Sequence, residues 1–154
     1  MQLAWGYAPP LIIAAAVRAG VFAALKDHPR SIDELVQATG ASARGLRAVV
    51  NALVALQLLR RQDGGYALTP ESATYLVPGL AGYRGDFFHH HTDHLLPQWM
   101  QLAEVLRTGR PVVATNREDG GADHFAGFVE SLFPGSYPAA KALGKSSTNP
   151  ANVT

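Results

Sequence analysis

The most apolar part of the chain is residues 11–25, LIIAAAVRAGVFAAL, where only Arg18 and Gly20 interrupt the apolar positions. Pro9 and Pro10 come just before this run and suit the first turn of a helix, where the N–H that proline lacks would have no partner. Gly20 suits a helix C-terminus, so the pattern predicts two short helices on either side of it. A helix without a polar face is either buried all round in its own domain or shared between subunits, and the pattern leaves both possibilities open.

The next segment predicts two further helices with clear start signals. Ser31 and Glu34 form a capping box, in which each side chain bonds the other residue's backbone N–H. Gly40 ends this first helix after about two turns. Ser42 then caps a longer helix, which we expect to cover residues 43–59.

A β-hairpin is expected after these helices. Residues 59–62 and 66–68 read as two short strands, with Asp63-Gly64-Gly65 as the tight turn between them. Thr69 and Pro70 then begin another short helix. Helix, turn, long helix and hairpin follow one another in the order of a winged-helix unit. The predicted fold class is therefore mainly α, with a winged-helix core, a small β-hairpin wing and additional helices.

After residue 78 the sequence indicates a change of organisation. Glycines at positions 79, 82 and 85 predict a loose joint. A helical region is expected from Asp86 to Leu106, interrupted or kinked at Pro97. The tail is short, polar and rich in Ser and Asn. We therefore expect three parts: residues 1–78, the winged-helix core with its preceding helices; residues 79–143, a helical connector; and residues 144–154, a linker.

Composition restricts the possible partners. Of the 154 residues, 47% are hydrophobic and 16% are charged, which is a low charge content for a soluble monomer. This balance indicates that some apolar surface is buried against a partner. The formal net charge of +1 gives no strong attraction to polyanions, and the lack of cysteine excludes disulfides, thiolate metal sites and a cysteine nucleophile. Because Arg18 lies inside the apolar run and no basic segment precedes it, neither a signal peptide nor a membrane span fits, and we expect a cytoplasmic protein with no membrane partner.

A winged helix raises the possibility of DNA binding. The helix expected over residues 43–59 offers Arg44, Arg47 and Asn51 as polar candidates for reading bases. Across residues 31–76, however, four arginines are balanced by four acidic residues. Phosphate contacts supply most of the nonspecific affinity for DNA, so a neutral unit is poorly equipped for it. We expect no nucleic-acid partner, and keep a winged-helix regulator that binds DNA or a ligand as the alternative.

The segment His89-His90-His91-Thr92-Asp93-His94 has the pattern H-x-H-x-D-H, which resembles the metal-binding signature of the metallo-β-lactamase family. Closely spaced imidazoles and a carboxylate can serve as zinc ligands. That family places the motif after a buried apolar strand and before a glycine, whereas Leu95-Leu96-Pro97 follows here. In a helix only pairs such as His90 with His94 share a face. We expect no metal site, and a zinc hydrolase is the least favoured alternative.

The chain shows no motif for catalysis on its own. Gly79, Gly82 and Gly85 are spaced G-x-x-G-x-x-G but lack the preceding strand that a dinucleotide-binding fingerprint requires. There is no G-x-S-x-G segment for a serine nucleophile. We therefore expect neither catalytic nor cofactor-binding residues in this chain.

Four stretches, taken in order, carry a family resemblance. They are residues 11–25, with an alanine-rich run before a G-(L/V)-F step; residues 31–59, with an S-x-x-E-L start; residues 66–70, YALTP; and residues 99–111, WMQL followed by RTGRP. The chain resembles the N-terminal dimerisation domain of the S-adenosylmethionine-dependent O-methyltransferases of plant and bacterial secondary metabolism.

The resemblance implies a homodimer whose N-terminal dimerisation helices interlock, and a domain that covers one wall of the pocket for a small-molecule substrate. It also implies that S-adenosylmethionine and the catalytic histidine belong to a Rossmann-like domain after the linker, so that this chain alone is inactive. Residues 128–132, FVESL, resemble the family's F-x-x-A-M segment, which places Leu132 at the position of the pocket-lining methionine, with ordinary core packing left open. Phe128, His91 and Trp99 are the other candidate substrate-lining residues.

Overall fold

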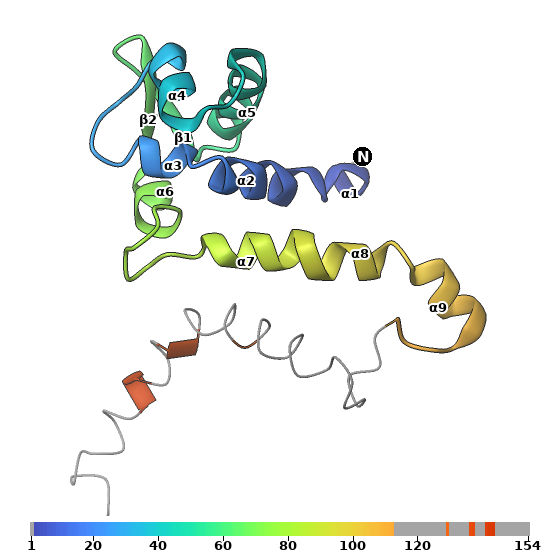
Figure 1. The fold of residues 1–154 in the computed structure, drawn as a ribbon. Coiled ribbons are helices and arrows are strands. Elements are labelled where there is room, and N and C mark those ends of the chain that lie inside the picture. Colours follow the sequence, from blue (N-terminus) through green and yellow to red (C-terminus); the bar gives the residue numbers. More distant parts are fainter. Residues whose placement is uncertain (1, 113–128, 130–135, 138–140, 144–154) are drawn as a thin grey trace, which may run out of the picture.

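The structure is a computed structural model that describes residues 2–112, 129, 136–137 and 141–143. Figure 1 shows a winged-helix unit above helix α2, and a long helical segment on the other side of α2. The elements are α1 (Gln2–Trp5), α2 (Ala8–Arg18), α3 (Val21–Ala24), α4 (Ile32–Thr39), α5 (Ala43–Ala55), β1 (Leu59–Gln62), β2 (Gly65–Leu68), α6 (Pro70–Tyr75), α7 (Gly85–His90), the π-helical turn η1 (His91–Leu95), α8 (Leu96–Trp99) and α9 (Leu102–Thr108).

Local capping signals fix the starts and ends of the winged-helix elements. Ser31 and Glu34 form the predicted capping box, and the hydrogen bond from the Ser31 backbone N–H holds the pKa of Glu34 below its usual range. Gly40 ends α4 with a φ of 70°. The hydroxyl of Ser42 caps α5. The mainly α fold with a winged-helix core is therefore confirmed, and its boundaries follow from local chemistry.

Helix α5 is shorter than the sequence predicts. We expected a helix over residues 43–59, but α5 ends at Ala55. Gln57 has a φ of 59°, a left-handed conformation that an α-helix cannot contain, and Leu58 N–H donates to the carbonyl of Leu53. The chain thereby turns out of the helix in time for Leu59 to begin β1.

The hairpin pairs Leu59 with Leu68 and Gln62 with Gly65 in antiparallel register. Its turn is only two residues long, because Gly65 is already part of β2. Asp63 and Gly64 both have positive φ values, of 50° and 77°, as the twist-matched two-residue hairpin turn requires.

The segment just before α4 pairs with this small sheet at a single residue, Arg30. Arg30 and Tyr66 exchange backbone hydrogen bonds of 3.0 and 2.8 Å. The approach leaves no room for a side chain at Gly65, where a Cβ would lie 2.6 Å from the carbonyl oxygen of Arg30. The sheet is thus tied to the chain just before α4.

The core lies between the winged-helix elements and the N-terminal helices. Its fully buried side chains come from α3, α4, α5 and both strands, and include Phe22, Leu35, Val50, Leu53 and Tyr66. Residues far apart in the sequence therefore share one apolar cluster, which is the main source of stability for a domain of this size.

The segment between α6 and α7 packs tightly, although the sequence suggested a loose joint. A Cβ on Gly82 would lie 2.7 Å from the carbonyl oxygen of Thr74, and one on Gly85 would overlap the ring of Tyr83. Only Gly79 of the three glycines needs a positive φ, of 82°. These glycines mainly permit close approach of the backbone. The predicted boundary after residue 78 stays a prediction.

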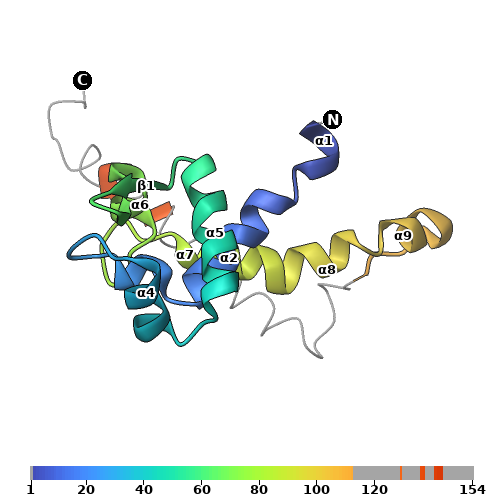
Figure 2. The same cartoon turned by 90° about the horizontal axis from the view of Figure 1, so that it is seen from above.

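The helical segment after this joint forms an arm, defined as residues 85–99 (α7, η1 and α8). The sequence predicts an interruption or kink at Pro97, but this residue lies within the first turn of α8. The segment departs from a regular α-helix at two other points. One is the π-helical turn η1 before Pro97, and the other is the break between α8 and α9 after it. Figure 2 shows α9 bending away from the arm at the end of the molecule farthest from the hairpin.

The close approach at Gly65 generates a stability prediction. Gly65→Ala should lower the free energy of unfolding by about 1–3 kcal/mol, because the new methyl group would press on the Arg30 backbone. Asp63→Gly in the same hairpin is the matched control. It should stay within about 1 kcal/mol of the parent, because glycine adopts the positive φ of this position without strain. Urea unfolding followed by circular dichroism measures both, and equal losses would contradict the steric explanation.

Candidate dimerisation surface and histidine-bearing arm

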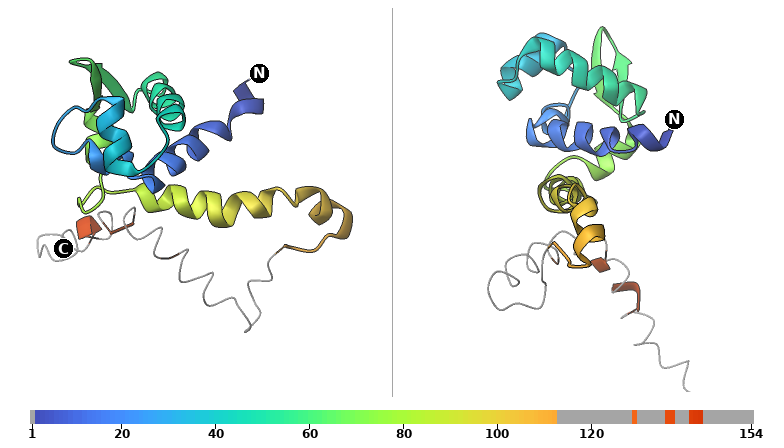
Figure 3. Two further views of the ribbon diagram at one scale, coloured as in Figure 1. Left: turned by 45° about the horizontal axis from the view of Figure 1, so that its top comes forward. Right: turned by 90° about the vertical axis from the view of Figure 1, so that its right-hand side faces the viewer.

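Helix α2 lies between two layers of the same chain. It contacts α5 of the winged-helix unit on one side and α7 and η1 of the arm on the other. The two views in Figure 3 also place α2 between these parts. Ala14 and Ala16 are its buried residues, and their small side chains allow close packing.

The position of α2 shows which part of the apolar run over residues 11–25 is buried within its own chain. Its second half lies in the core of its own chain, with Ala16, Val21, Phe22 and Leu25 buried. Leu11 in its first half is only half-buried. Most of the run therefore stabilises one subunit, and only part of α2 remains free to meet a partner.

Large exposed apolar side chains occur at several places among the described residues, and two groups of them lie near α1 and near the end of the arm. Trp5 and Tyr7, at the end of α1 and just after it, are exposed and stack on one another with ring centroids 6.4 Å apart. The second place, here called the arm-end surface, consists of Trp99, Met100, Leu102 and Leu106, with exposed fractions of 65%, 80%, 46% and 79%. Figures 1, 2 and 3 all place α1 and α8–α9 at the same end of the molecule. Exposed apolar side chains that form a continuous surface are typical of interaction sites.

The structure describes two of the four residues that the sequence suggested as substrate-lining. His91 is half-buried at the start of η1, and its ring lies 6.3 Å from that of Phe87. Trp99 ends α8 and is largely exposed. Among the described residues, the ring contact of His91 is with Phe87 and not with Trp99. Phe128 and Leu132 lie outside the described residues, so the pocket wall stays a prediction.

Two histidines of the segment His89–His94 lie on the same face of the helix. The rings of His90 and His94 lie 5.2 Å apart, as expected for residues one turn apart, and His90 is only 7% exposed. The Nε2 atom of His89 is buried without a hydrogen-bond partner. Within the described part of the chain, no group of three or more His, Cys, Asp or Glu side chains is arranged to hold a metal ion.

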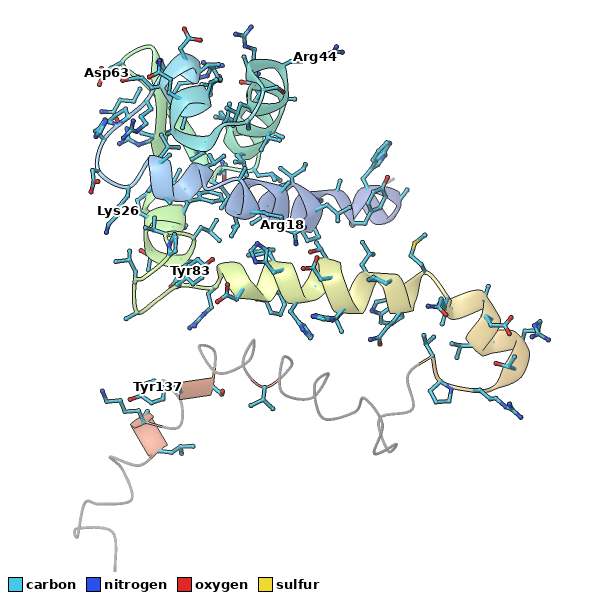
Figure 4. The ribbon with its side chains drawn as sticks, viewed as in Figure 1. Arg18, Lys26, Arg44, Asp63, Tyr83 and Tyr137 are labelled. Atoms are coloured by element: carbon cyan, nitrogen blue, oxygen red, sulfur yellow. The ribbon has the colours of Figure 1, made fainter. Side chains whose placement is uncertain are left out.

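An ion pair that the sequence did not predict joins α2 to the arm. One guanidinium nitrogen of Arg18, the residue labelled on α2 in Figure 4, lies 2.9 Å from both carboxylate oxygens of Asp93. The Thr92 hydroxyl lies within hydrogen-bond distance of the same carboxylate, at 3.0 Å, and of the His89 carbonyl, at 3.1 Å. The hydrogen bond from Arg18, and next that from Thr92, hold the pKa of Asp93 below its usual range. The available signal was Arg18 itself, a single charge in an otherwise apolar helix.

The winged helix uses part of its polar surface internally. Asn51, a candidate for base reading, accepts hydrogen bonds from Arg61 and from the Tyr66 hydroxyl, at 2.9 and 3.1 Å. The Arg61 guanidinium also lies over the Tyr66 ring, 4.1 Å from its centroid. These contacts fasten the hairpin to α5. Arg44 and Arg47 remain exposed on α5.

A membrane-spanning role finds no support in the helices that the structure describes, because none of them combines the length and the apolar character needed to cross a bilayer.

Comparisons with known proteins agree with this architecture. The family model of the O-methyltransferase dimerisation domain matches residues 1–78. A 3-hydroxy-5-methyl-1-naphthoate 3-O-methyltransferase of Streptomyces sahachiroi is 33% identical over 151 residues, which are 94% of this chain and 43% of that protein. The chain thus spans less than half the length of this curated relative.

Solved structures show the same fold. Human N-acetylserotonin methyltransferase in complex with SAM matches with a TM-score of 0.76 and 21% identity, over 88% of this chain and 44% of that one. An O-methyltransferase family protein from Burkholderia thailandensis matches with a TM-score of 0.75 and 23% identity, over 92% of this chain and 42% of that one. With a family model that matches half of its residues, this chain belongs to the O-methyltransferase dimerisation-domain family.

Proposed function

We propose that this chain is the dimerisation and substrate-pocket part of a small-molecule O-methyltransferase. In the full-length enzyme a methyl group would pass from S-adenosylmethionine to a hydroxyl of the substrate. The single observation that carries this proposal is the match of residues 1–78 to the dimerisation-domain family, joined to a relative named as a 3-O-methyltransferase. The whole enzyme would work in the cytoplasm.

We infer that the substrate is an aromatic compound that carries a hydroxyl. The name of the Streptomyces relative specifies a hydroxylated naphthoate, which is a flat, two-ring aromatic. On the arm of this chain, Phe87 and His91 supply neighbouring aromatic faces that suit the packing of such a ring system. Phe128 and Leu132 would complete the same wall.

The contribution of this chain to the reaction would be enclosure and orientation. Methyl transfer requires the attacking oxygen and the methyl carbon to lie in line, and a closed pocket lowers the entropic cost of that geometry. Side chains on the arm would hold the aromatic ring and exclude water. Proton transfer and cofactor binding would belong to the rest of the enzyme.

We propose that the described residues do not bind S-adenosylmethionine. Their sheet is a two-stranded antiparallel hairpin closed by a two-residue turn, without a strand that leads into a glycine-rich loop. The side chains of Ser31, Ser42 and Thr69 cap α4, α5 and α6, so one backbone N–H in the first turn of each helix already has a partner.

We further propose that the homodimer forms through the N-terminal helices and extends onto the arm-end surface. Trp5 and Tyr7 together with Trp99, Met100 and Leu106 place exposed apolar side chains at one end of the molecule. Permanent dimers bury large, mostly apolar interfaces of about 2,000 Å² or more. The low charge content of 16% fits a chain that covers such a surface with a second copy.

The dimer proposal is tested by sedimentation velocity at micromolar concentration. The chain should sediment as a dimer, with twice its mass of 16.4 kDa. A Met100→Lys, Leu106→Lys variant should dissociate at least about tenfold more readily, because charges would be buried in an apolar contact. Ala55→Lys is the matched control, since Ala55 is exposed at the C-terminus of α5, where a positive charge is favourable. A parent chain that stays monomeric would overturn the proposal.

Calorimetry tests the proposal that cofactor binding belongs to the rest of the enzyme and not to this chain. Titration of S-adenosylmethionine into this chain should give no binding at micromolar concentrations, because the described residues offer no loop for its ribose and carboxylate. Saturable heat with a micromolar Kd would place a cofactor site on this chain and contradict the proposal.

The regulator alternative makes an opposite prediction about DNA. We expect no sequence-specific complex in a gel-shift experiment, because Asn51 is held by Arg61 and Tyr66 and the winged-helix segment has no net charge. A salt-sensitive shift that disappears in the Arg44→Ala, Arg47→Ala variant would support the regulator instead.

A further inference from the structure

The π-helical turn in the arm has a cause in the sequence. In a regular α-helix residue 97 would donate to the carbonyl of Asp93, but Pro97 has no N–H and its ring would press on that carbonyl. The structure widens the helix just before this point, and Leu96 N–H bonds the carbonyl of His91, five residues back. A π turn of this kind holds one more residue than an α turn and occurs often at functional positions.

The ion pair between Arg18 and Asp93 lies on this widened turn. Among the described residues, the other ion pair, between Arg107 and Glu104, stays within α9, so Arg18–Asp93 is the one that joins different elements. Arg18 is in the last turn of α2, and Asp93 is in the middle of η1. The contact therefore ties the helix at the centre of the fold to the one irregular turn of the arm.

We infer that Asp93 is a positioning residue, and that its ion pair with Arg18 holds the π turn and thereby sets the direction of the arm-end surface. This inference rests on the proposed dimer, because the arm-end surface is part of the interface proposed above. Asp93 would act through the backbone of η1, because its carboxylate bonds Arg18 and Thr92 and not the residues of that surface.

The geometric consequence follows from helix periodicity. Removing the extra residue of a π turn would rotate everything after it by about 100° around the arm axis and shift it by about 1.5 Å. Trp99, Met100 and Leu106 all follow the turn and would rotate together. The exposed apolar side chains of the arm end would then point in a new direction around the arm axis while α1 would keep its place. The two parts of the proposed interface would therefore no longer have the same orientation relative to one another.

The position of the ion pair lets it favour the π turn over a regular α turn of the same residues. Pro97 removes the hydrogen bond that would favour the regular α form, so the two forms are closer in free energy than in an ordinary helix. The Asp93 carboxylate accepts from Arg18 on both oxygens, and the Thr92 hydroxyl adds a contact from the same turn. The two side chains are 60% and 46% accessible, and an exposed ion pair contributes little to stability. It can select the π turn only because the two forms lie close in free energy.

Distance measurement between spin labels tests the inference directly. The chain has no cysteine, so Arg44→Cys and Ala103→Cys provide unique labelling sites on the winged helix and on α9. Labelled chain diluted into excess unlabelled chain reports the distance within one subunit. The parent should give one narrow distance distribution. Asp93→Asn and Arg18→Gln should each shift or broaden it, and the charge-swapped Arg18→Asp, Asp93→Arg variant should restore it.

Glu104→Gln is the matched control, because it removes an ion pair that stays within α9. It should leave the distribution unchanged. A parental distribution in Asp93→Asn and Arg18→Gln, an equal change in Glu104→Gln, or no recovery in the charge-swapped variant would each overturn the inference.

Sedimentation of the unlabelled Asp93→Asn variant provides the second readout. Its dimer should dissociate at least about tenfold more readily than the parent, and a parental dissociation constant would overturn the link to the interface. If the parent itself proves monomeric, the proposed dimer fails, while the distance within one subunit still decides whether Asp93 sets the direction of the arm.

Discussion

The structure depends on the packing of α2 against two layers of its own chain. A helix without a polar face is stable in water only if it is covered all round, and here the winged-helix unit covers one side and the arm another. Ala14 and Ala16 let the backbones come close at this centre. Most of the apolar run over residues 11–25 is thus buried within one chain and not free to contact a second subunit. The exposed apolar side chains proposed to contact a partner lie instead on and beside α1 and on the arm-end surface.

Local chemistry made much of the fold predictable. Ser31 with Glu34, Gly40 and Ser42 each act within a few residues, so their roles could be read from the sequence alone, and the structure confirms them. The family resemblance, carried by short stretches in order, is confirmed as well. The predicted end of this helix at residue 59 was wrong, because no residue type before Gln57 indicates the left-handed backbone that ends α5 at Ala55.

The candidate site was less predictable because it depends on contacts across the fold. Arg18 and Asp93 are 75 positions apart, and no local pattern pairs them. Pro97 signalled a disturbance but not its form, since a proline can end a helix, kink it or widen the turn before it. Of the expected pocket wall, His91 and Trp99 lie on the arm, while Phe128 and Leu132 lie outside the described residues. In the proposed enzyme, the arm would bring this wall to the substrate while the N-terminal helices join the subunits.

Hydrogen–deuterium exchange at rising protein concentration tests most directly whether these two surfaces form the interface. Amide protection reports burial and stable hydrogen bonding segment by segment. Protection should increase with concentration in α1, in the exposed part of α2 and in residues 98–108, while the hairpin at residues 59–68 should exchange at a constant rate. Exchange that is independent of concentration in α1 and in residues 98–108, or added protection confined to the hairpin, would contradict a dimer built on these surfaces.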